Sequence, residues 1–144
     1  MGDRDLAHLE ATFKRKIEAW IPECKAAGYT VLVTDGYRSF AEQDALYAQG
    51  RTTEGPKVTN AKAGDSYHNV RRAVDYCILV HGRASYDGAA LKATAKLAEG
   101  HGIEWGGRWP TFHDDDHLQW AYCEQHEERH SGAHAFDETG NCRA

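Results

Sequence analysis

Two histidines and one aspartate in this sequence have the types and spacing of ligands for a catalytic metal ion. His68 and Asp75 lie seven positions apart, and His117 follows much later in the chain. A mononuclear catalytic zinc site uses three protein ligands and keeps a fourth position open for water. Imidazole nitrogen and carboxylate oxygen suit zinc, and a ligand set without thiolate leaves the ion a good Lewis acid. We therefore predict a zinc site at His68, Asp75 and His117.

A general base is needed beside such a site, and an acidic run directly precedes the third ligand. Asp114, Asp115 and Asp116 stand next to His117. Three adjacent acids are also typical of a solvated turn or of a loose calcium contact. On an extended segment alternate residues share a face, so periodicity alone favours Asp115 as the acid that points with His117. The residues by themselves leave the choice among the three acids open.

These residues belong to a longer series of motifs that resembles a known family. Ser66-x-His68 with Ala73-x-Asp75, followed by Asp114-x-x-His117-x-x-Trp120, is similar to the VanY-type zinc peptidases that cut bacterial cell walls. That family includes D-Ala-D-Ala carboxypeptidases, dipeptidases and phage endolysins that act as L-alanyl-D-glutamate peptidases. The resemblance spans roughly residues 30–120, and one departure is Arg71, which stands where the family has a glycine. Further matching motifs are Asp35-Gly36-Tyr37-Arg38-Ser39, Glu42-Gln43, Tyr47-Ala48-Gln49-Gly50-Arg51-Thr52, Val58-Thr59 and Trp105-Gly106-Gly107.

The resemblance implies a role for each matching residue. It singles out Asp114 as the proton shuttle. It implies that Arg38 polarises the scissile carbonyl and stabilises the oxyanion, a task that suits a fixed guanidinium donor. Ser66 and Gln43 are the candidates for hydrogen bonds to substrate.

The implied activity is zinc-dependent hydrolysis of a peptide bond in peptidoglycan stem peptides. The motifs in residues 47–52 and 58–59 favour the L-alanyl-D-glutamate bond, as in small single-domain phage endolysins with antimicrobial activity. Two alternatives stay open. One is a D-Ala-D-Ala carboxypeptidase of the same family, and the other is a catalytically silent, zinc-bearing module that binds the cell wall.

Hydrophobic patterning predicts the elements that must position these residues. Residues 73–80 read as a buried strand with Asp75 inside it, where a lone carboxylate is costly without a cation nearby. A β-branched strand over residues 30–34 ends at a turn, and the alternation of residues 117–122 indicates a third strand. The fold class that fits is α+β, with helices covering one side of a small, mainly antiparallel sheet and the metal at its edge. The resemblance supplies most of this outline, the fold of the hedgehog-like DD-peptidases.

Three helices are predicted around these strands. Apolar residues at steps of three and four indicate a helix over residues 5–27, with a kink or break near Trp20 because of Pro22. A second helix starts at Ser39 with a capping box, and Asp87 caps a third over residues 89–99. Arg38 is thereby held at a junction between a strand and a helix. Residues 51–65 lack a clear period and are expected to form a loop that wraps the cleft. 

Composition limits the partners that the protein can have. A chain of 144 residues, with 41% hydrophobic and 27% charged residues, is expected to form one globular domain. A formal charge of -5 argues against nucleic acid, which usually selects a basic surface. No apolar run approaches the length of a membrane span, and the start of the chain does not read as a signal peptide. We expect a monomer, made in a host cytoplasm, that acts on the cell wall after a separate pore releases it.

The end of the chain differs in character from the catalytic domain expected over residues 1–122. Residues 123–144 are polar, and we expect a loosely packed or disordered tail. This tail contains a literal His-Glu-x-x-His motif from His126 to His130, which in metalloproteases lies on a buried amphipathic helix. Few apolar residues surround it here, so we do not expect an active site. A metal-binding patch with Cys123 or Cys142 is the alternative.

The four cysteines form an even set, which in a secreted protein would suggest two disulfides. Because the chain shows no secretion signal, we expect free thiols. Cys77 lies in an apolar strand, where packing is its expected role. The four are Cys24, Cys77, Cys123 and Cys142.

Overall fold

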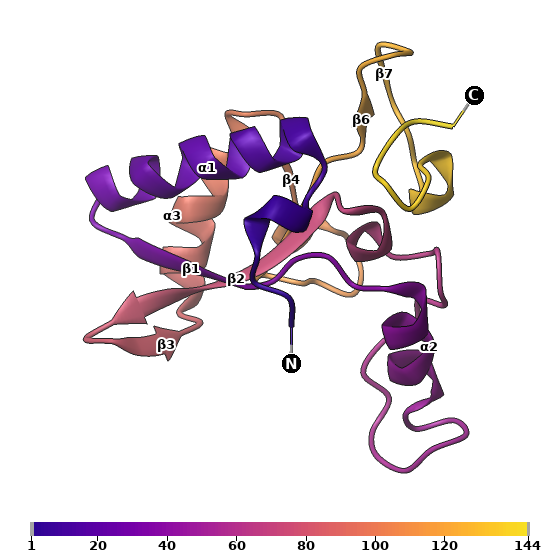
Figure 1. Cartoon of the computed structure of the whole chain (residues 1–144). Helices are drawn as coiled ribbons and strands as arrows, with labels where there is room; N and C mark the ends of the chain where they lie inside the picture. Colours follow the sequence, from indigo (N-terminus) through magenta and orange to yellow (C-terminus); the bar gives the residue numbers. More distant parts are fainter. Residues whose placement is uncertain (1, 144) are drawn as a thin grey trace.

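An antiparallel sheet with two helices on one face makes up the body of the protein, in the α+β architecture expected. The computed structural model describes residues 2–143. Its main sheet has the order β1-β2-β5-β4, and the short strand β3 pairs with β2 (Figure 1). The strands are β1 (Thr30–Asp35), β2 (Ala73–Val80), β3 (Arg83–Ser85), β4 (Glu104–Trp105) and β5 (His117–Gln119), and the two helices are α1 (Ala11–Ala26) and α3 (Gly88–Glu99).

The core lies between this sheet and the two helices. Side chains alternate along a strand, so Val74, Tyr76 and Ile78 all face the helices and are buried. Trp20 of α1 donates its Nε1–H to the Thr94 carbonyl of α3 at 2.8 Å, and its ring meets the Tyr76 ring edge-on. The same alternation sends Asp75 to the opposite face of β2. The packed core therefore provides a rigid support for Asp75 and the other side chains on that second face of the sheet.

Helix α1 differs from the expected break at Pro22. The helix continues through Pro22 to Ala26, and the interruption comes earlier, where a 3-10 turn η1 (Leu6–His8) precedes the cap residue Glu10. Proline removes one helical hydrogen bond and crowds the preceding turn. Trp20 and Cys24, on either side of Pro22, have no exposed surface, so core packing holds both halves of the helix in line.

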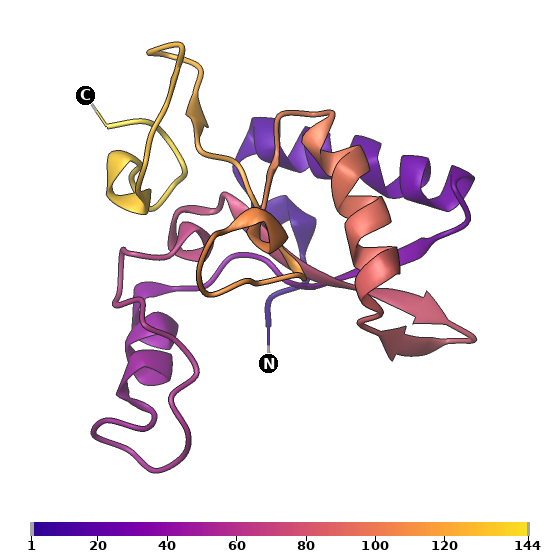
Figure 2. The same cartoon turned by 180° about the vertical axis from the view of Figure 1, so that it is seen from behind.

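Helix α2 and the long loop after it project away from the sheet (Figures 1 and 2). Helix α2 covers Phe40–Ala48 and starts with the expected capping box, in which Ser39 and Glu42 satisfy each other's backbone N–H groups. The α3 cap is also as expected, because the Asp87 side chain accepts the Ala90 N–H at 3.0 Å. Residues 51–65 contain no helix or strand of their own.

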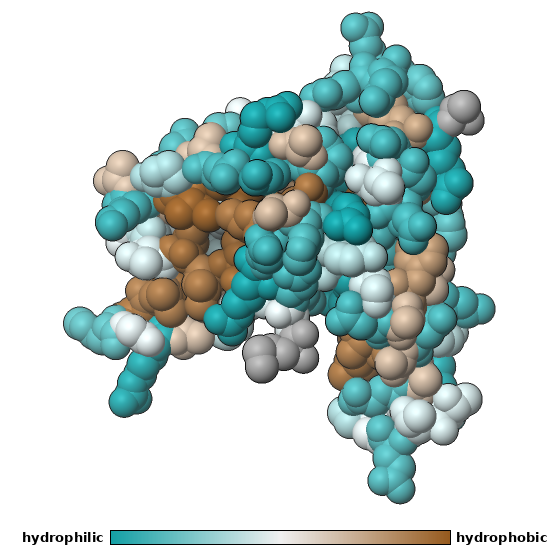
Figure 3. Space-filling view, viewed as in Figure 1, coloured by the Kyte–Doolittle hydropathy of each residue, from teal (hydrophilic) through white to brown (hydrophobic). Residues whose placement is uncertain are grey.

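The surface view shows where apolar side chains remain visible. In Figure 3 hydrophobic residues gather between α1 and the strands β1 and β3, whereas hydrophilic residues cover most of the C-terminal segment. Val80, at the end of β2, is 48% exposed. In residues 2–143 no helix combines the length and apolar character that crossing a bilayer requires.

The C-terminal segment is folded, which corrects the expectation of a loose or disordered tail. It contains the hairpin strands β6 (Tyr122–Cys123) and β7 (Glu128–Arg129) and the 3-10 turn η4 (Ala133–Ala135). Its anchor is Arg72, which donates to the carbonyls of Gly140 and Tyr122, each at 2.8 Å, and stacks on Phe136. A second small core forms around these contacts. Its buried members are Tyr67, Val70, Ala73, Ala121, Cys123, Ala133 and Phe136.

Cysteine pairing also differs in part from the expectation of free thiols. Cys123 and Cys142 form a disulfide, with their Cα atoms 5.9 Å apart. Cys24 and Cys77 are free and buried, as expected. Burial raises the pKa of the Cys24 thiol to about 12, so this side chain is a packing group without thiolate reactivity at neutral pH.

Arg71, which replaces the family glycine, adopts the left-handed backbone conformation with φ 64°. Its guanidinium lies 3.8 Å from the Tyr37 ring centroid and donates to the carbonyls of Glu138 and His8. The side chain therefore joins the N-terminal segment to the tail. Left-handed backbone at a residue with a side chain costs about 1 kcal/mol or more, which these contacts offset.

The change Arg71→Gly is expected to leave metal binding intact and not to lower peptidase activity. Glycine relieves the backbone strain, while one hydrogen bond to Glu138 of the tail and one to His8 of the N-terminal segment are lost, so the free energy of unfolding should change by only about 1 kcal/mol. Metal content, hydrolysis of cell wall and thermal unfolding measure the three quantities. A large loss of hydrolysis would show that Arg71 has acquired a role in the reaction.

Candidate metal centre

The ladder between β2 and β5 brings two of the candidate ligands together. Asp75 and His117 are direct partners across these antiparallel strands. Their neighbours Val74 and Leu118 point into the core, so Asp75 and His117 share the opposite face. The His117 Nδ1 atom lies 3.2 Å from an Asp75 carboxylate oxygen.

The third candidate ligand, His68, lies on the short 3-10 helix η2 (Tyr67–Val70). Ser66 caps this helix, and its hydroxyl accepts the His68 N–H at 3.2 Å. The loop after β1 holds the helix in place, because the Arg38 N–H donates to the His68 carbonyl and Asn69 donates to the Arg38 carbonyl, each at 3.0 Å. His68 Nε2 thereby lies 3.3 Å from the same Asp75 oxygen.

The three side chains fit a zinc ion in both spacing and protonation. One ligand atom from each of His68, Asp75 and His117 lies within 4.8 Å of the other two. His68 Nδ1 faces the Gly36 carbonyl at 2.7 Å, and His117 Nε2 faces the Gln119 amide oxygen at 2.9 Å. Both outer nitrogens therefore donate, which leaves the inner nitrogens free to bind a metal. The set contains two imidazoles and one carboxylate, a composition found in catalytic zinc sites.

The electrostatics of this cluster favour a bound cation. Burial raises the pKa of Asp75, but hydrogen bonds from His117 and His68 outweigh it, and the net pKa lies well below the ordinary aspartate value. Burial lowers the pKa of His117, but the Asp75 carboxylate outweighs that, and the net pKa is raised. The buried carboxylate thus draws positive charge to this point. A metal ion must displace the His117 proton, so metal affinity should fall as the pH is lowered.

Asp114 and Asp116, but not Asp115, lie beside this cluster. Carboxylate oxygens of Asp75, Asp114 and Asp116 lie within 4.8 Å of one another, whereas Asp115 is exposed. Burial, a hydrogen bond with Asp114 and the charge of Asp75 together raise the pKa of Asp116 to about 7. When protonated, Asp116 can donate a hydrogen bond to Asp114. Simple alternation favoured Asp115, but residues 114–116 form a turn before β5 begins, so the period of a strand does not apply there.

Two glycines hold the segment that carries Asp114. The Asp114 N–H donates to the Gly106 carbonyl at 3.2 Å. A Cβ atom on Gly106 would lie 2.4 Å from the Asp114 carbonyl oxygen, closer than any real contact, and one on Gly107 would enter the Trp105 ring. Close packing thus explains both glycines of the Trp105-Gly106-Gly107 motif, against Asp114 at Gly106 and against the Trp105 ring at Gly107.

Arg38 lies at the edge of the cluster in a fixed orientation. Its guanidinium donates to the Asp35 carboxylate at 2.6 Å and to the Gln43 amide oxygen at 3.0 Å. Gln43 has no exposed surface, and its amide nitrogen donates to the Ala61 carbonyl at 2.7 Å. This placement corrects the expected substrate contact by Gln43, because the side chain is fully buried and does not line the cavity that contains the candidate ligands. Gln43 instead positions Arg38.

A cavity of about 580 Å³ joins these groups. Its wall includes all three candidate ligands together with Arg38, Asp114 and Ser66. The loop formed by residues 58–61 and the segment that contains Trp109 and Phe112 also line it. Ser66 therefore reaches the cavity, although its hydroxyl also caps η2. The cavity is open and mixed in polarity, which suits an extended peptide with polar groups.

The sequence did not point to Gln119, which orients His117 through the hydrogen bond at Nε2. The sequence did contain a signal for this contact, because Gln119 lies two positions after His117 and residues two apart on a strand share a face. The change Gln119→Leu is expected to weaken zinc binding about 10-fold to 100-fold, because outer hydrogen bonds fix the ligand ring and its protonation. Zinc affinity measured by competition with a chelator tests this. Gln119→Glu, which can still accept the hydrogen bond, should retain tighter binding than Gln119→Leu; equal affinities in all three proteins would contradict the role.

The His-Glu-x-x-His motif of the tail does not form a metalloprotease site. Its residues lie on the β6–β7 hairpin and not on a helix, and none of them lines the cavity. His126 and His130 instead lie close to Cys123.

Comparisons with known proteins agree with this geometry. A family model described as D-alanyl-D-alanine carboxypeptidase matches residues 59–120. The peptidoglycan L-alanyl-D-glutamate endopeptidase CwlK of Bacillus subtilis (strain 168) is 36% identical over 121 residues, which cover 77% of this chain and 72% of CwlK. Two solved structures share the fold. The Serratia marcescens L-Ala D-Glu endopeptidase ChiX gives a TM-score of 0.63 at 22% identity, covering 83% of this chain and 88% of ChiX. The vancomycin-resistance D,D-pentapeptidase VanY in complex with Zn(II) gives a TM-score of 0.59 at 15% identity, covering 78% of this chain and 72% of VanY.

Proposed function

Since this chain belongs to the VanY-type zinc peptidase family, we propose that it is a zinc-dependent peptidoglycan endopeptidase that cuts the L-alanyl-D-glutamate bond of stem peptides. The observation that carries the proposal is the 36% identity with CwlK, which acts on that bond by its name. The cavity adds support, because it joins a complete zinc ligand set to an acid and a fixed arginine.

Six residues of the cavity wall have a defined task in this proposal. His68, Asp75 and His117 would hold zinc, which when bound would supply the Lewis acidity that makes water a nucleophile near neutral pH. Asp114 accepts the proton of the attacking water and later passes a proton to the leaving amine. Arg38, held by Asp35 and Gln43, donates to the oxyanion that develops on the scissile carbonyl. Ser66, which lines the cavity, is the residue that contacts the peptide in this proposal.

We propose that the protein serves as a phage endolysin of this type. The support is the resemblance of its motifs, in residues 47–52 and 58–59, to those of small phage endolysins. In this proposal the protein works as a monomer on the cell wall after release from the host cytoplasm. Its partner is the peptidoglycan stem peptide. The net charge of -5 does not favour nucleic acid as a ligand.

The family description favours one second candidate, a D-Ala-D-Ala carboxypeptidase. Mass analysis of products from purified cell wall separates the two, because one reaction releases terminal D-Ala and the other severs L-Ala from D-Glu. The reaction should stop with a chelator and return with zinc. Metal binding without any released peptide would instead support a silent wall-binding module.

A further inference from the structure

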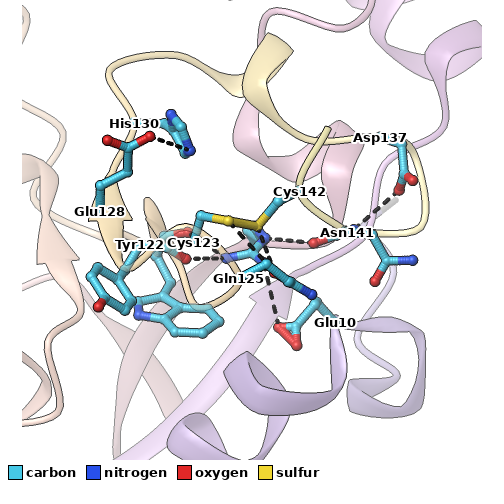
Figure 4. The surroundings of a disulfide bond; sticks show 12 residues. Glu10, Tyr122, Cys123, Gln125, Glu128, His130, Asp137, Asn141 and Cys142 are labelled. Carbon is cyan, nitrogen blue, oxygen red and sulfur yellow. Dashed lines mark hydrogen bonds and ion pairs between the residues drawn. A yellow bond between two sulfur atoms is a disulfide. The ribbon is translucent and has the colours of Figure 1, made fainter. Parts of the chain in front are cut away.

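The tail holds a second group of metal-binding side chains, apart from the catalytic cavity. Ligand atoms of Cys123, His126 and His130 lie within 4.8 Å of one another. Cys142 adds a second sulfur, bonded to Cys123 at 2.07 Å. Figure 4 shows the disulfide with His130 and Glu128 above it. The hairpin thus carries one sulfur and two imidazoles within reach of one another, and the bond to Cys142 brings a second sulfur next to the first.

The composition and spacing of this group match a structural zinc site. Two cysteine sulfurs and two imidazoles form one of the usual closed tetrahedral sets. His126 and His130 are separated by three residues, within the range of paired histidine ligands in zinc fingers. Cys123 pairs with Glu128 across the β6–β7 hairpin, and this pairing brings Cys123 next to the His126–His130 motif. The His-Glu-x-x-His sequence therefore has a use that requires no helix.

The ring of His130 gives an independent observation that points to a ligand. Its Nε2 atom is buried and has no hydrogen-bond partner in the described structure, and the nearest acid, Glu128, is 3.8 Å away. The backbone of His130 is fixed on both sides, by its own N–H on the Ala121 carbonyl and by the Tyr67 hydroxyl on its carbonyl. A buried ring nitrogen without a partner is unfavourable. A metal ion at this point would satisfy it.

We propose that Cys123, His126, His130 and Cys142 form a zinc site in the reduced protein, and that the disulfide and zinc are alternative closures of the same tail. Two ligands on one tetrahedral zinc lie about 3.3 to 3.8 Å apart, so sulfurs joined by a bond cannot both bind the ion. A dithiol reductant transfers two electrons and two protons, leaving two thiols here and becoming a disulfide itself. Zinc then binds both sulfurs as thiolates and releases the two protons.

The disulfide and the proposed zinc site each keep the tail against the catalytic domain. The segment between Cys123 and Cys142 carries Phe136 and Gly140, which contact Arg72. Either a covalent bond or a shared metal holds the ends of this segment together. In the proposed function the protein moves from the host cytoplasm to the cell wall, and this one point rests on that proposal. Zinc suits the reducing cytoplasm, and the disulfide suits the cell wall.

Cobalt(II) binding to the full chain tests the proposal. One sample is reduced with a dithiol that is then removed without oxygen, and the other keeps the disulfide. The reduced protein should bind one more metal equivalent than the oxidised protein. It alone should show the near-ultraviolet charge-transfer band of thiolate bound to cobalt, because the catalytic centre has no sulfur ligand.

Three variants make the result specific. The double change His126→Ala with His130→Ala should remove the extra equivalent and weaken the band, and its unchanged thermal unfolding when oxidised would show that it folds. Cys77→Ala should keep the band, which excludes that one of the two buried free thiols as its source. His68→Ala with His117→Ala should also keep it, so that this proposal and the catalytic assignment fail separately. No extra equivalent in the reduced protein, or an undiminished band without His126 and His130, would overturn the proposal.

Discussion

Replacing His68 and His117 together with alanine is expected to abolish zinc binding at the catalytic centre and to reduce peptidase activity to background. The two changes remove both imidazoles and leave Asp75 as a single ligand, 23% exposed in its side chain. One carboxylate does not hold zinc against water at the affinity of a three-ligand site. Metal content after gel filtration and hydrolysis of purified cell wall, with the tail disulfide intact, measure the two effects.

The matched control is the double change His126→Ala with His130→Ala. In the oxidised protein it should change neither zinc content nor hydrolysis, because neither histidine lines the cavity. The two variants remove the same number of imidazoles, so any general effect of histidine loss appears in both. If only the tail variant lost zinc and activity, the assignment of the catalytic centre would be wrong.

The change Asp114→Asn is expected to lower kcat about 100-fold to 10,000-fold while zinc stays bound. Asparagine keeps the size of the side chain and can accept the hydrogen bond from Asp116, but its amide cannot take a proton from water. The ligand atoms are untouched, so zinc content and the KM for cell-wall fragments should change little. Steady-state kinetics with a soluble stem peptide and metal analysis on the same sample test this.

Asp115→Asn is the matched control for the acidic run. Asp115 is exposed and does not line the cavity, so this variant should keep its activity within about twofold, as surface changes usually do. The pair of variants decides between the resemblance, which selects Asp114, and the strand alternation, which favours Asp115. Full activity in Asp114→Asn, or equal losses in both, would remove Asp114 from the mechanism.

Short sequence patterns correctly predicted the features that depend on contacts between neighbours in the chain. The capping box at Ser39 and the cap at Asp87 are short-range hydrogen bonds between a side chain and nearby backbone, and both occur as expected. The buried strand over residues 73–80 has the expected bounds, because an apolar run bounded by turns leaves little choice. Pro22 was misjudged, since core contacts of Trp20 and Cys24 outweigh a local helix-breaking tendency.

By itself the sequence determined the residue types of the catalytic centre, since two imidazoles, one carboxylate, an acid and an arginine are chemical identities that folding does not change. Only the tertiary structure decided their arrangement. The β2–β5 register places Asp75 opposite His117, and the packing of η2 brings His68 to the same oxygen. It also decided that Gln43 holds Arg38 and that the tail closes on Arg72, because such contacts join segments far apart in the chain, and no local pattern encodes the distance between them.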